Sequence, residues 1–394
     1  MGRSRPTPAP AGGEGAPPAL RFDRNEWAGA FGDIGTDLPL IVGMILAAGL
    51  DSASVLFMFG AMQIATGVWY RMPMPVQPLK AMAAIVITQK LTGNVLYGGG
   101  LAIGLLMLVL TATRLIEWLA RVTPLVVIRG IQFGLGLQLA TLALREYVRA
   151  DGVPGYVLAG LAFLATLALI GNRRYPAALV VIALGIIYAA LFALRVDAVL
   201  DGVGLRWPRF FVPTASDVLT GLLVLALPQL PLSLGNSILA TQQSARDFFP
   251  DRPLSVRKIS ATYAVMNLIH PFFSGIPTCH GSGGLVGHYT FGGRTGGSVV
   301  IYGSLYVLLG LVLSGGFNEV IRVFPLPVLG VLLLFEGLAL MALLGRLPDL
   351  KADLPIALLV GLIAGSLPYG YVVAMLLGML LASAAGRRLT RLAR

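Results

Sequence analysis

The sequence consists mainly of long apolar runs, separated by short stretches that contain glycine, proline or charged residues. About 20 apolar residues are enough to cross the hydrocarbon core of a bilayer. Only 12% of the residues are charged, about half of the usual share in a soluble domain, so the runs face lipid or each other. We therefore predict an all-α polytopic membrane protein with 14 transmembrane segments, at residues 28–50, 53–70, 77–92, 97–119, 123–144, 154–171, 175–195, 216–243, 256–273, 279–291, 298–315, 319–344, 354–370 and 371–386.

The two halves of the chain resemble each other in the positions of glycine and proline. Five identical pairs lie 201 or 202 positions apart: Pro75 and Pro277, Pro124 and Pro325, Gly136 and Gly337, Pro154 and Pro355, and Gly160 and Gly361. We interpret them as two seven-helix repeats, at residues 27–196 and 216–386, with an inter-repeat loop at 197–215. Because seven is odd, the second repeat enters the membrane from the opposite side and is inverted. Inverted repeats are typical of secondary transporters, whose sites lie near the midplane where broken helices meet.

The positive charges predict the orientation in the membrane. With a cytoplasmic N-terminus, 20 of the 29 Lys and Arg residues fall on the cytoplasmic side and seven on the other, with Lys80 and Arg129 inside helices. Cytoplasmic loops carry such an excess, so we predict a multi-pass protein of the plasma (inner) membrane with both termini in the cytoplasm. These termini are a disordered tail at 1–26, rich in Pro, Ala and Gly, and a basic tail at 387–394. The charges are spread between the apolar runs, which argues against a nucleic-acid partner.

Two of the apolar runs are short, and each follows a stretch that contains proline. Prolines keep residues 72–78 extended, and Pro78 is suited to be the first helical residue. A helix that begins at membrane depth offers unpaired backbone N–H groups and a partial positive charge, which suit an anion. Lys80 falls in the first turn, where an anion would offset the cost of burying its charge. The alternative is that Lys80 pairs with an acid or reaches the interface.

The matching stretch of the second repeat is rich in glycine. Gly281 and Gly283 allow close approach of backbone to a ligand. Cys279, His280 and Ser282 lie beside them, and we expect His280 to donate to an anion or to titrate near neutral pH. The other two histidines of the chain are expected to be structural.

The first helix of each repeat supplies the remaining candidates. Asp33 and Asp37 share one helical face, and acids inside the membrane are functional candidates by default. One of them would neutralise Lys80 and one would carry a coupling proton, unless the segment begins at the interface and leaves them solvated. Glu336 is a further coupling candidate, or a partner of Arg129. The predicted substrate-binding residues are Thr36, Gln77, Lys80, Gln229, Ser233, Asn236, Ser237, Cys279, His280, Gly281, Ser282 and Gly283.

Four motifs resemble the molybdate transporter family, relatives of the SulP anion transporters that lack the cytoplasmic STAS domain. They are Phe31-Gly-Asp-Ile-Gly-Thr-Asp-Leu-Pro39, Pro73-Met-Pro-Val-Gln-Pro-Leu-Lys80, Pro228-Gln-Leu-Pro-Leu-Ser-Leu-Gly-Asn-Ser237 and Cys279-His-Gly-Ser-Gly-Gly-Leu-Val-Gly287, the last followed by Phe291-Gly-Gly-Arg294. The resemblance implies a seven-plus-seven fold with core and gate domains. It also implies an anion held between the facing ends of helices three and ten. The expected substrate is a tetrahedral oxyanion, molybdate or sulfate, carried by alternating access, and a homodimer is left open.

Two other classes of protein fit the sequence less well. A nucleobase or xanthine transporter of the same fold would place carboxylates on helices eight and ten, and residues 228–243 and 276–291 contain neither Asp nor Glu. An intramembrane enzyme would need a catalytic motif, and the chain has no His-Glu-x-x-His, Gly-x-Ser-x-Gly or phosphate-loop sequence. We therefore expect a transporter and no enzyme, with no cofactor and no metal site, whose partners are a small oxyanion and the lipid bilayer.

Overall fold

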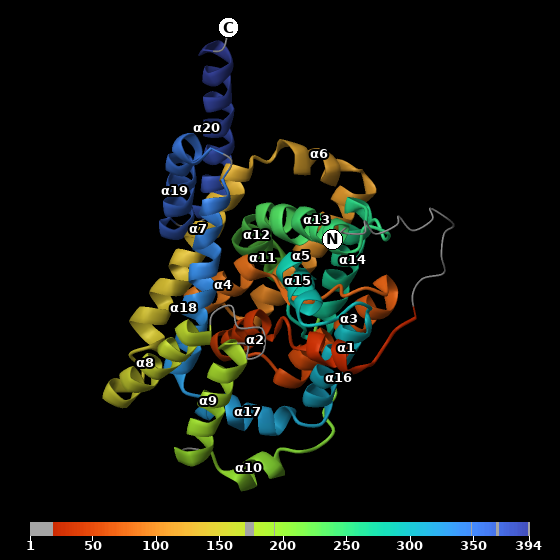
Figure 1. Cartoon of the computed structure of the whole chain (residues 1–394), viewed down its shortest axis with the longest axis vertical. Coiled ribbons are helices and arrows are strands. Elements are labelled where there is room, and N and C mark those ends of the chain that lie inside the picture. The colour runs from red at the N-terminus through yellow and green to blue at the C-terminus, as the bar shows by residue number, and fades with distance from the viewer. Residues whose placement is uncertain (1–18, 170–176, 193, 348, 368–369, 393–394) are drawn as a thin grey trace, which may run out of the picture.

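The computed structural model describes residues 19–169, 177–192, 194–347, 349–367 and 370–392 (Figure 1). These residues are almost entirely helical, and η marks short π or 3-10 stretches. In chain order the elements are α1 (Arg24–Ala30), α2 (Ile34–Ala48), α3 (Ser52–Tyr70), β1 (Val76–Pro78), α4 (Lys80–Gln89), α5 (Gly93–Ala112), α6 (Leu115–Val122), α7 (Leu125–Leu142), η1 (Ala143–Tyr147), α8 (Gly152–Leu169), α9 (Ala177–Phe192), α10 (Val196–Asp201), α11 (Ala215–Gly221), η2 (Leu222–Ala226), α12 (Leu227–Leu232), η3 (Ser233–Ala240), α13 (Thr241–Phe248), α14 (Val256–Ile269), η4 (His270–Phe273), β2 (Thr278–His280), α15 (Ser282–Thr290), α16 (Gly297–Leu311), α17 (Ser314–Val323), α18 (Leu326–Ala342), η5 (Leu343–Arg346), α19 (Leu350–Ser366) and α20 (Gly370–Leu392).

The helices are apolar on the outside as well as inside. On α8, Val153, Val157, Leu161 and Leu164 form an exposed stripe at helical spacing, which suits contact with lipid. Six helical stretches among the described residues are each long and apolar enough to cross a membrane, and the bent pair α16 and α17 would make a seventh. The protein is therefore a multi-pass membrane protein, and the count of fourteen segments stays a prediction.

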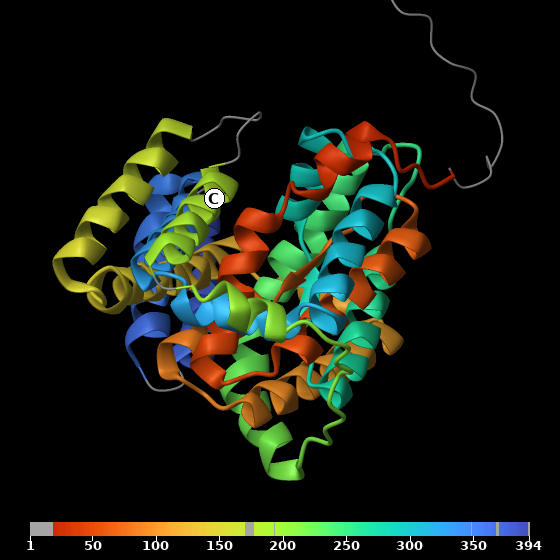
Figure 2. The same ribbon diagram turned by 90° about the horizontal axis from the view of Figure 1, so that it is seen from below.

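The helices form two bundles, each built from both halves of the chain. The first bundle comprises α1–α5 and α11–α16, in which α3 packs on α16 and α5 packs on α11 and α14. The second bundle comprises α7–α9 and α18–α20, in which α7 packs on α18 and α19 (Figures 1 and 2). Elements α2, α4 and α12 of the first bundle make the contacts with the second.

Residues paired by the sequence repeat occupy matching places. Pro124 and Pro325 are the residues that directly precede α7 and α18 and cap them. Gly136 and Gly337 lie against each other where these helices cross, because each backbone carbonyl occupies the space of a side chain on the other glycine. The pairing of the halves thus agrees with the geometry at α7 and α18.

Several predicted helices are divided in the structure. The run 28–50 breaks between α1 and α2, where Gly32 packs directly on the backbone of Gly287. The run 97–119 becomes α5 and α6, separated at Arg114, which has a positive φ of 61°. The run 319–344 becomes α17 and α18, because Pro325 cannot continue a helix. The angle between α16 and α17 is 89°.

The ends and the inter-repeat loop contain more helix than predicted. Helix α1 begins inside the predicted tail 1–26, because the Asp23 side chain accepts hydrogen bonds from Asn25 N and Glu26 N at 2.9 and 3.2 Å. Residues 1–18 lie outside the described part of the chain. Helix α10 lies in the predicted loop 197–215, and α20 continues to Leu392, where Leu and Arg favour helix.

A short antiparallel ribbon of β1 and β2 departs from the all-α prediction. Its register pairs Val76 with His280, Gln77 with Cys279 and Pro78 with Thr278. Each strand matches the other at an offset of 202 positions, so the ribbon has an approximate two-fold axis at its central pair, Gln77 and Cys279. Pro75 and Pro277 directly precede the two strands and Pro78 ends β1. Proline lacks the N–H donor of a helix, which favours extended backbone at these places.

Two amide side chains hold the ribbon in equivalent ways. Gln63 from α3 donates to Val76 O at 2.7 Å and accepts from Val76 N at 2.9 Å. Asn267 from α14 donates to Thr278 O at 2.6 Å and accepts from Thr278 N at 2.9 Å. All four groups are buried, so each strand has the backbone partners that its short ribbon cannot supply.

Candidate functional site

Two short helices begin at the ribbon, as the sequence predicted. Helix α4 has 10 residues and α15 has 9, which at 1.5 Å per residue gives about 15 and 14 Å. Each therefore spans about half of the roughly 30 Å hydrocarbon core. The predicted start of α4 at Pro78 was wrong, because Pro78 belongs to β1 and α4 begins at Lys80 after Leu79. Likewise, α15 begins at Ser282, three residues later than predicted.

The N-terminus of α4 is closed by a side chain from α12. Gln229 Oε1 accepts hydrogen bonds from Ala81 N at 2.9 Å and Met82 N at 3.3 Å. Gln229 Nε2 in turn donates to Ser233 Oγ at 3.1 Å, and Ser233 Oγ lies 2.8 Å from Tyr263 OH. The predicted site residue Gln229 thus satisfies amides in the first turn of α4, and Ser233 holds the Gln229 side chain.

The N-terminus of α15 is open by comparison. Its cap residue Gly281 provides no side-chain hydrogen bond. Gly283 is exposed, and a methyl group added there would meet no atom within 4 Å. Ser282 is half-buried between them. In the first turn of α15, accessible space therefore lies beside Ser282 and Gly283.

Asp33 and Gln77 lie beside the first turn of α15. Gln77 Nε2 lies 2.6 and 2.7 Å from the two carboxylate oxygens of Asp33. The Asp33 carboxylate occupies the space that a side chain at Gly284 would need, and the Gln77 amide does the same at Gly281. These glycines are therefore required by close packing, and Asp33 lies where a helix N-terminus favours a negative charge.

Lys80 pairs with Glu336 of the second bundle. Lys80 Nζ lies 2.7 Å from Glu336 Oε1, and the two side chains are only 18% and 11% exposed. The structure therefore shows the alternative in which Lys80 pairs with an acid. That acid is Glu336, whereas Asp33 and Asp37 act on Lys80 electrostatically without an ion-pair contact. Arg129, considered as a partner of Glu336, donates to Gln132 Oε1 at 2.8 Å.

Asp37 is also buried. Its Oδ2 accepts from Tyr302 OH at 3.4 Å, whereas its Oδ1 has no hydrogen-bond partner among the residues that the structure describes. Asp33 and Asp37 are 3% and 0% exposed. The alternative that these acids are solvated at the interface is therefore excluded.

His280 is held inside the first bundle. Its Nε2 lies 2.7 Å from Thr262 Oγ1 and its Nδ1 lies 3.2 Å from Pro75 O. The ring also packs edge-on against Tyr70. Because both nitrogens have protein partners, His280 holds the ribbon in this conformation and does not face the open end of α15.

The other predicted site residues differ in their exposure. Cys279 and Ser237 are both buried. Asn236, on η3, is half-buried. Thr36 lies in α2, and its side chain is outside the described part of the structure.

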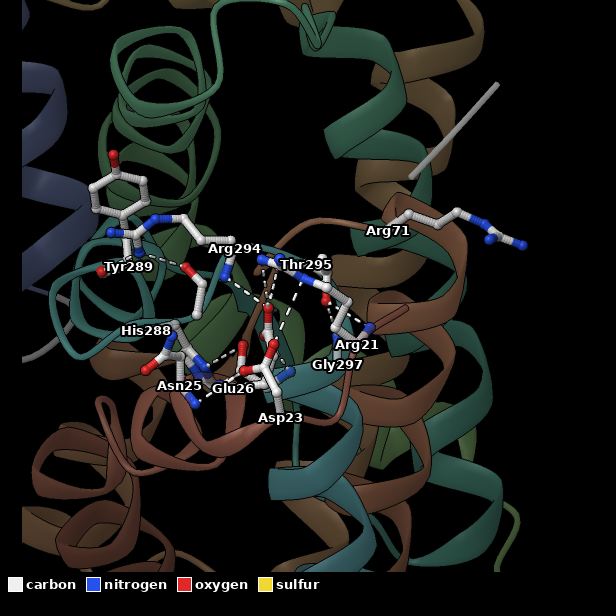
Figure 3. A network of polar contacts seen from close by, with 12 residues as sticks. Arg21, Asp23, Asn25, Glu26, Arg71, His288, Tyr289, Arg294, Thr295 and Gly297 are labelled. Carbon is white, nitrogen blue, oxygen red and sulfur yellow. Dashed lines mark hydrogen bonds and ion pairs between the residues drawn. The ribbon is translucent and has the colours of Figure 1, made fainter. Parts of the chain in front are cut away.

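Sequence reasoning missed a buried carboxylate close to the motif that ends in Arg294. Glu26, fully buried on α1, accepts hydrogen bonds from the backbone N–H groups of Arg294, Thr295 and Ser298 at 3.0, 2.9 and 2.9 Å (Figure 3). It thus caps the start of α16 and fixes the loop after α15. The prediction that residues 1–26 are disordered hid this role.

The amides that hold the ribbon were also missed. Gln63 and Asn267 stand inside apolar runs, 204 positions apart. A polar amide at matching places of two repeats is a signal that could have identified them.

These features define the class of the protein. It is a polytopic membrane protein in which two half-helices meet at an extended crossing in the interior, an arrangement typical of secondary transporters.

The chain belongs to the molybdate transporter family. The family model described as "Molybdate transporter of MFS superfamily" matches residues 25–139 and 221–340. Molybdate transporter 2 of Arabidopsis thaliana is 34% identical over 365 residues, which cover 80% of this chain and 78% of the relative. Molybdate transporter 1 of the same plant is 31% identical over 400 residues, 86% of each protein.

Solved structures share the fold at low sequence identity. The transmembrane domain of the cyanobacterial bicarbonate transporter BicA aligns with a TM-score of 0.64 at 18% identity, covering 91% of this chain and 97% of that domain. SLC26A9 aligns with a TM-score of 0.69 at 13% identity, covering 92% of this chain and 64% of its own. The predicted likeness to the SulP-type anion transporters is thereby confirmed at the level of the fold.

Proposed function

We propose that the protein is a secondary active transporter that carries a tetrahedral oxyanion, molybdate or the similar sulfate, across the plasma membrane. The observation that carries this proposal is the N-terminus of α15, where the cap residue Gly281 has no side-chain hydrogen bond, Ser282 is half-buried and Gly283 borders accessible space. Unpaired amides at a helix start bind anions. The names of the two plant relatives support molybdate as the substrate.

In this proposal, the oxyanion lies between the starts of α15 and α4. The amides of α15 and the hydroxyl of Ser282 would donate hydrogen bonds, and the ammonium of Lys80 would balance charge. Gln77, Gln229, Ser233, Ser237 and Cys279 would hold these elements in place, and Asn236 would line the approach. His280 would position the ribbon, as its two hydrogen bonds suggest.

The fourteen-segment arrangement and its motion belong to the same proposal. The two bundles would act as core and gate domains, formed from two inverted seven-helix repeats with both termini in the cytoplasm. The equivalent clamps of Gln63 and Asn267, and the contact of Gly136 with Gly337, support the two-fold relation. Alternating exposure of the site would follow from movement of one bundle against the other.

We further propose that a proton is the coupling ion and that Asp37 carries it, with Asp33 beside it. Asp37 Oδ1 is buried without a hydrogen-bond partner among the described residues, which is costly for an ionised carboxylate. A neutral Asp37 avoids this cost. Its position one helical turn from Asp33 also disfavours two negative charges together.

Binding of molybdate, sulfate and uracil to the purified protein, compared side by side, tests the substrate. We expect binding of the oxyanions and none of uracil, since the ammonium of Lys80 and the start of α15 favour a ligand that carries negative charge. Binding of uracil in preference to both oxyanions would support the nucleobase class instead and would end the proposal.

A further inference from the structure

Helix α4 is tied to the second bundle at both of its ends by a Lys–Glu pair. At its start, Lys80 Nζ lies 2.7 Å from Glu336 Oε1 of α18. Just beyond its end, Lys90 Nζ lies 3.4 Å from Glu146 Oε2 of η1. The first pair is nearly buried, whereas the side chains of the second are 69% and 51% exposed. A Lys–Glu pair is therefore present at each end of α4, and only the pair of Lys80 with Glu336 lies at the site.

Glu336 is the only carboxylate in contact with the Lys80 ammonium among the described residues. Asp33 and Asp37, from α2, also act on Lys80 electrostatically. However, Asp33 receives its hydrogen bonds from Gln77, and Asp37 receives one from Tyr302. The contact that a bound oxyanion would make with Lys80 is thus already made by Glu336.

We propose that Glu336 is an internal competitor of the transported oxyanion for Lys80. This inference rests on the function proposed above. The oxyanion displaces the Glu336 carboxylate from the ammonium when it binds, and Glu336 displaces the oxyanion when it leaves. Because Glu336 belongs to the second bundle and Lys80 to the first, the exchange also breaks and remakes a contact between the bundles.

Competition has a clear kinetic signature. Apparent affinity is reduced by the fraction of molecules in which the binding group is free, so the competitor raises the KM of the wild-type protein. It also assists release, which often limits turnover. Removal of the Glu336 charge therefore lowers KM and kcat together. Simple damage to the site would raise KM.

The test compares Glu336→Gln with the matched variant Glu146→Gln, which breaks the other pair of α4. Molybdate uptake is measured in proteoliposomes that contain the full chain. For Glu336→Gln we expect KM to fall about tenfold, the effect of losing a contact worth roughly 1.4 kcal/mol, with a lower kcat. For Glu146→Gln we expect an unchanged KM. An unchanged or raised KM in Glu336→Gln, or an equal fall in both variants, overturns the proposal.

Two further measurements keep the test decisive. If Glu336→Gln does not fold, Glu336→Asp retains the charge on a shorter side chain, and its KM should fall by a smaller factor; an unchanged KM again overturns the proposal. Calorimetric binding of inorganic molybdate to the wild-type protein separates the two levels of inference. No binding at all contradicts the proposed function, whereas binding with no tightening in the Glu336 variant contradicts only the competition.

Discussion

The two half-helices begin at equivalent points of one ribbon, yet their first turns differ in chemistry. The start of α4 carries Lys80 and is closed by Gln229, whose side chain accepts from two backbone amides. The start of α15 carries glycines, has no capping side chain and is exposed at Gly283. The comparison shows that two equivalent half-helices can differ in role. The N-terminus of α4 is capped and carries a charge, whereas the N-terminus of α15 is left uncapped for a ligand.

The largest expected effect comes from Gly281→Ala, at the cap residue that joins β2 to α15. A methyl group there would overlap the Gln77 side chain, which is buried. Overpacking at a rigid position costs up to about 3 kcal/mol. We expect loss of folded protein, measured by size-exclusion chromatography and thermal melting. A variant that melts like the wild type would show that the ribbon can yield at this point.

Lys80→Ala should lower the rate of molybdate uptake roughly 100-fold, equivalent to about 2.7 kcal/mol. The reason is that the start of α4 would lose the ammonium that balances the charge of the anion. The control is the double variant Lys80→Ala with Glu336→Gln, which leaves no unpaired acid. Recovery of uptake in the double variant would mean that the stranded Glu336, and not the missing ammonium, caused the loss.

Gly283→Ala tests the open end of α15 at a position where nothing lies within 4 Å. We expect an unchanged melting temperature and a KM raised about fivefold, or about 1 kcal/mol, because the methyl group enters the space above the amides. Gly160→Ala, at an equally open and exposed position on α8, should change neither quantity. An unaffected KM in Gly283→Ala would place the anion elsewhere.

The smallest effect on transport is expected for Gln229→Leu, which removes the side chain that closes the start of α4. Loss of the acceptor for Ala81 N and Met82 N should lower the free energy of unfolding by about 2 kcal/mol. The KM should change less than in Gly283→Ala. A larger effect on KM than on stability would show that Gln229 touches the substrate directly and is more than a cap.

The sequence was sufficient for the parts of the fold that depend on local chemistry. Proline before each short helix and glycine in α15 predicted where helices begin inside the membrane. The matched pairs of proline and glycine predicted that α7 and α18 occupy equivalent places. Such features act within a few residues of themselves, so they can be recognised without coordinates.

Other parts depend on contacts between distant segments. Glu336 lies 256 positions from Lys80, and nothing in either local sequence favours it over Asp33 or Asp37. The role predicted for His280 depended on the direction of one side chain in an extended strand. Successive side chains of a strand point to opposite faces, so a prediction without a register cannot decide between Cys279 and His280.

The ribbon and its two amide clamps have a consequence for selectivity. Gln63 and Asn267 come from the same bundle and hold both strands through buried hydrogen bonds. The distance between the N-termini of α4 and α15 is therefore fixed by these hydrogen bonds. Oxyanions of different radius would then be sorted by how well they fit this width, because the protein cannot adjust it to the ion.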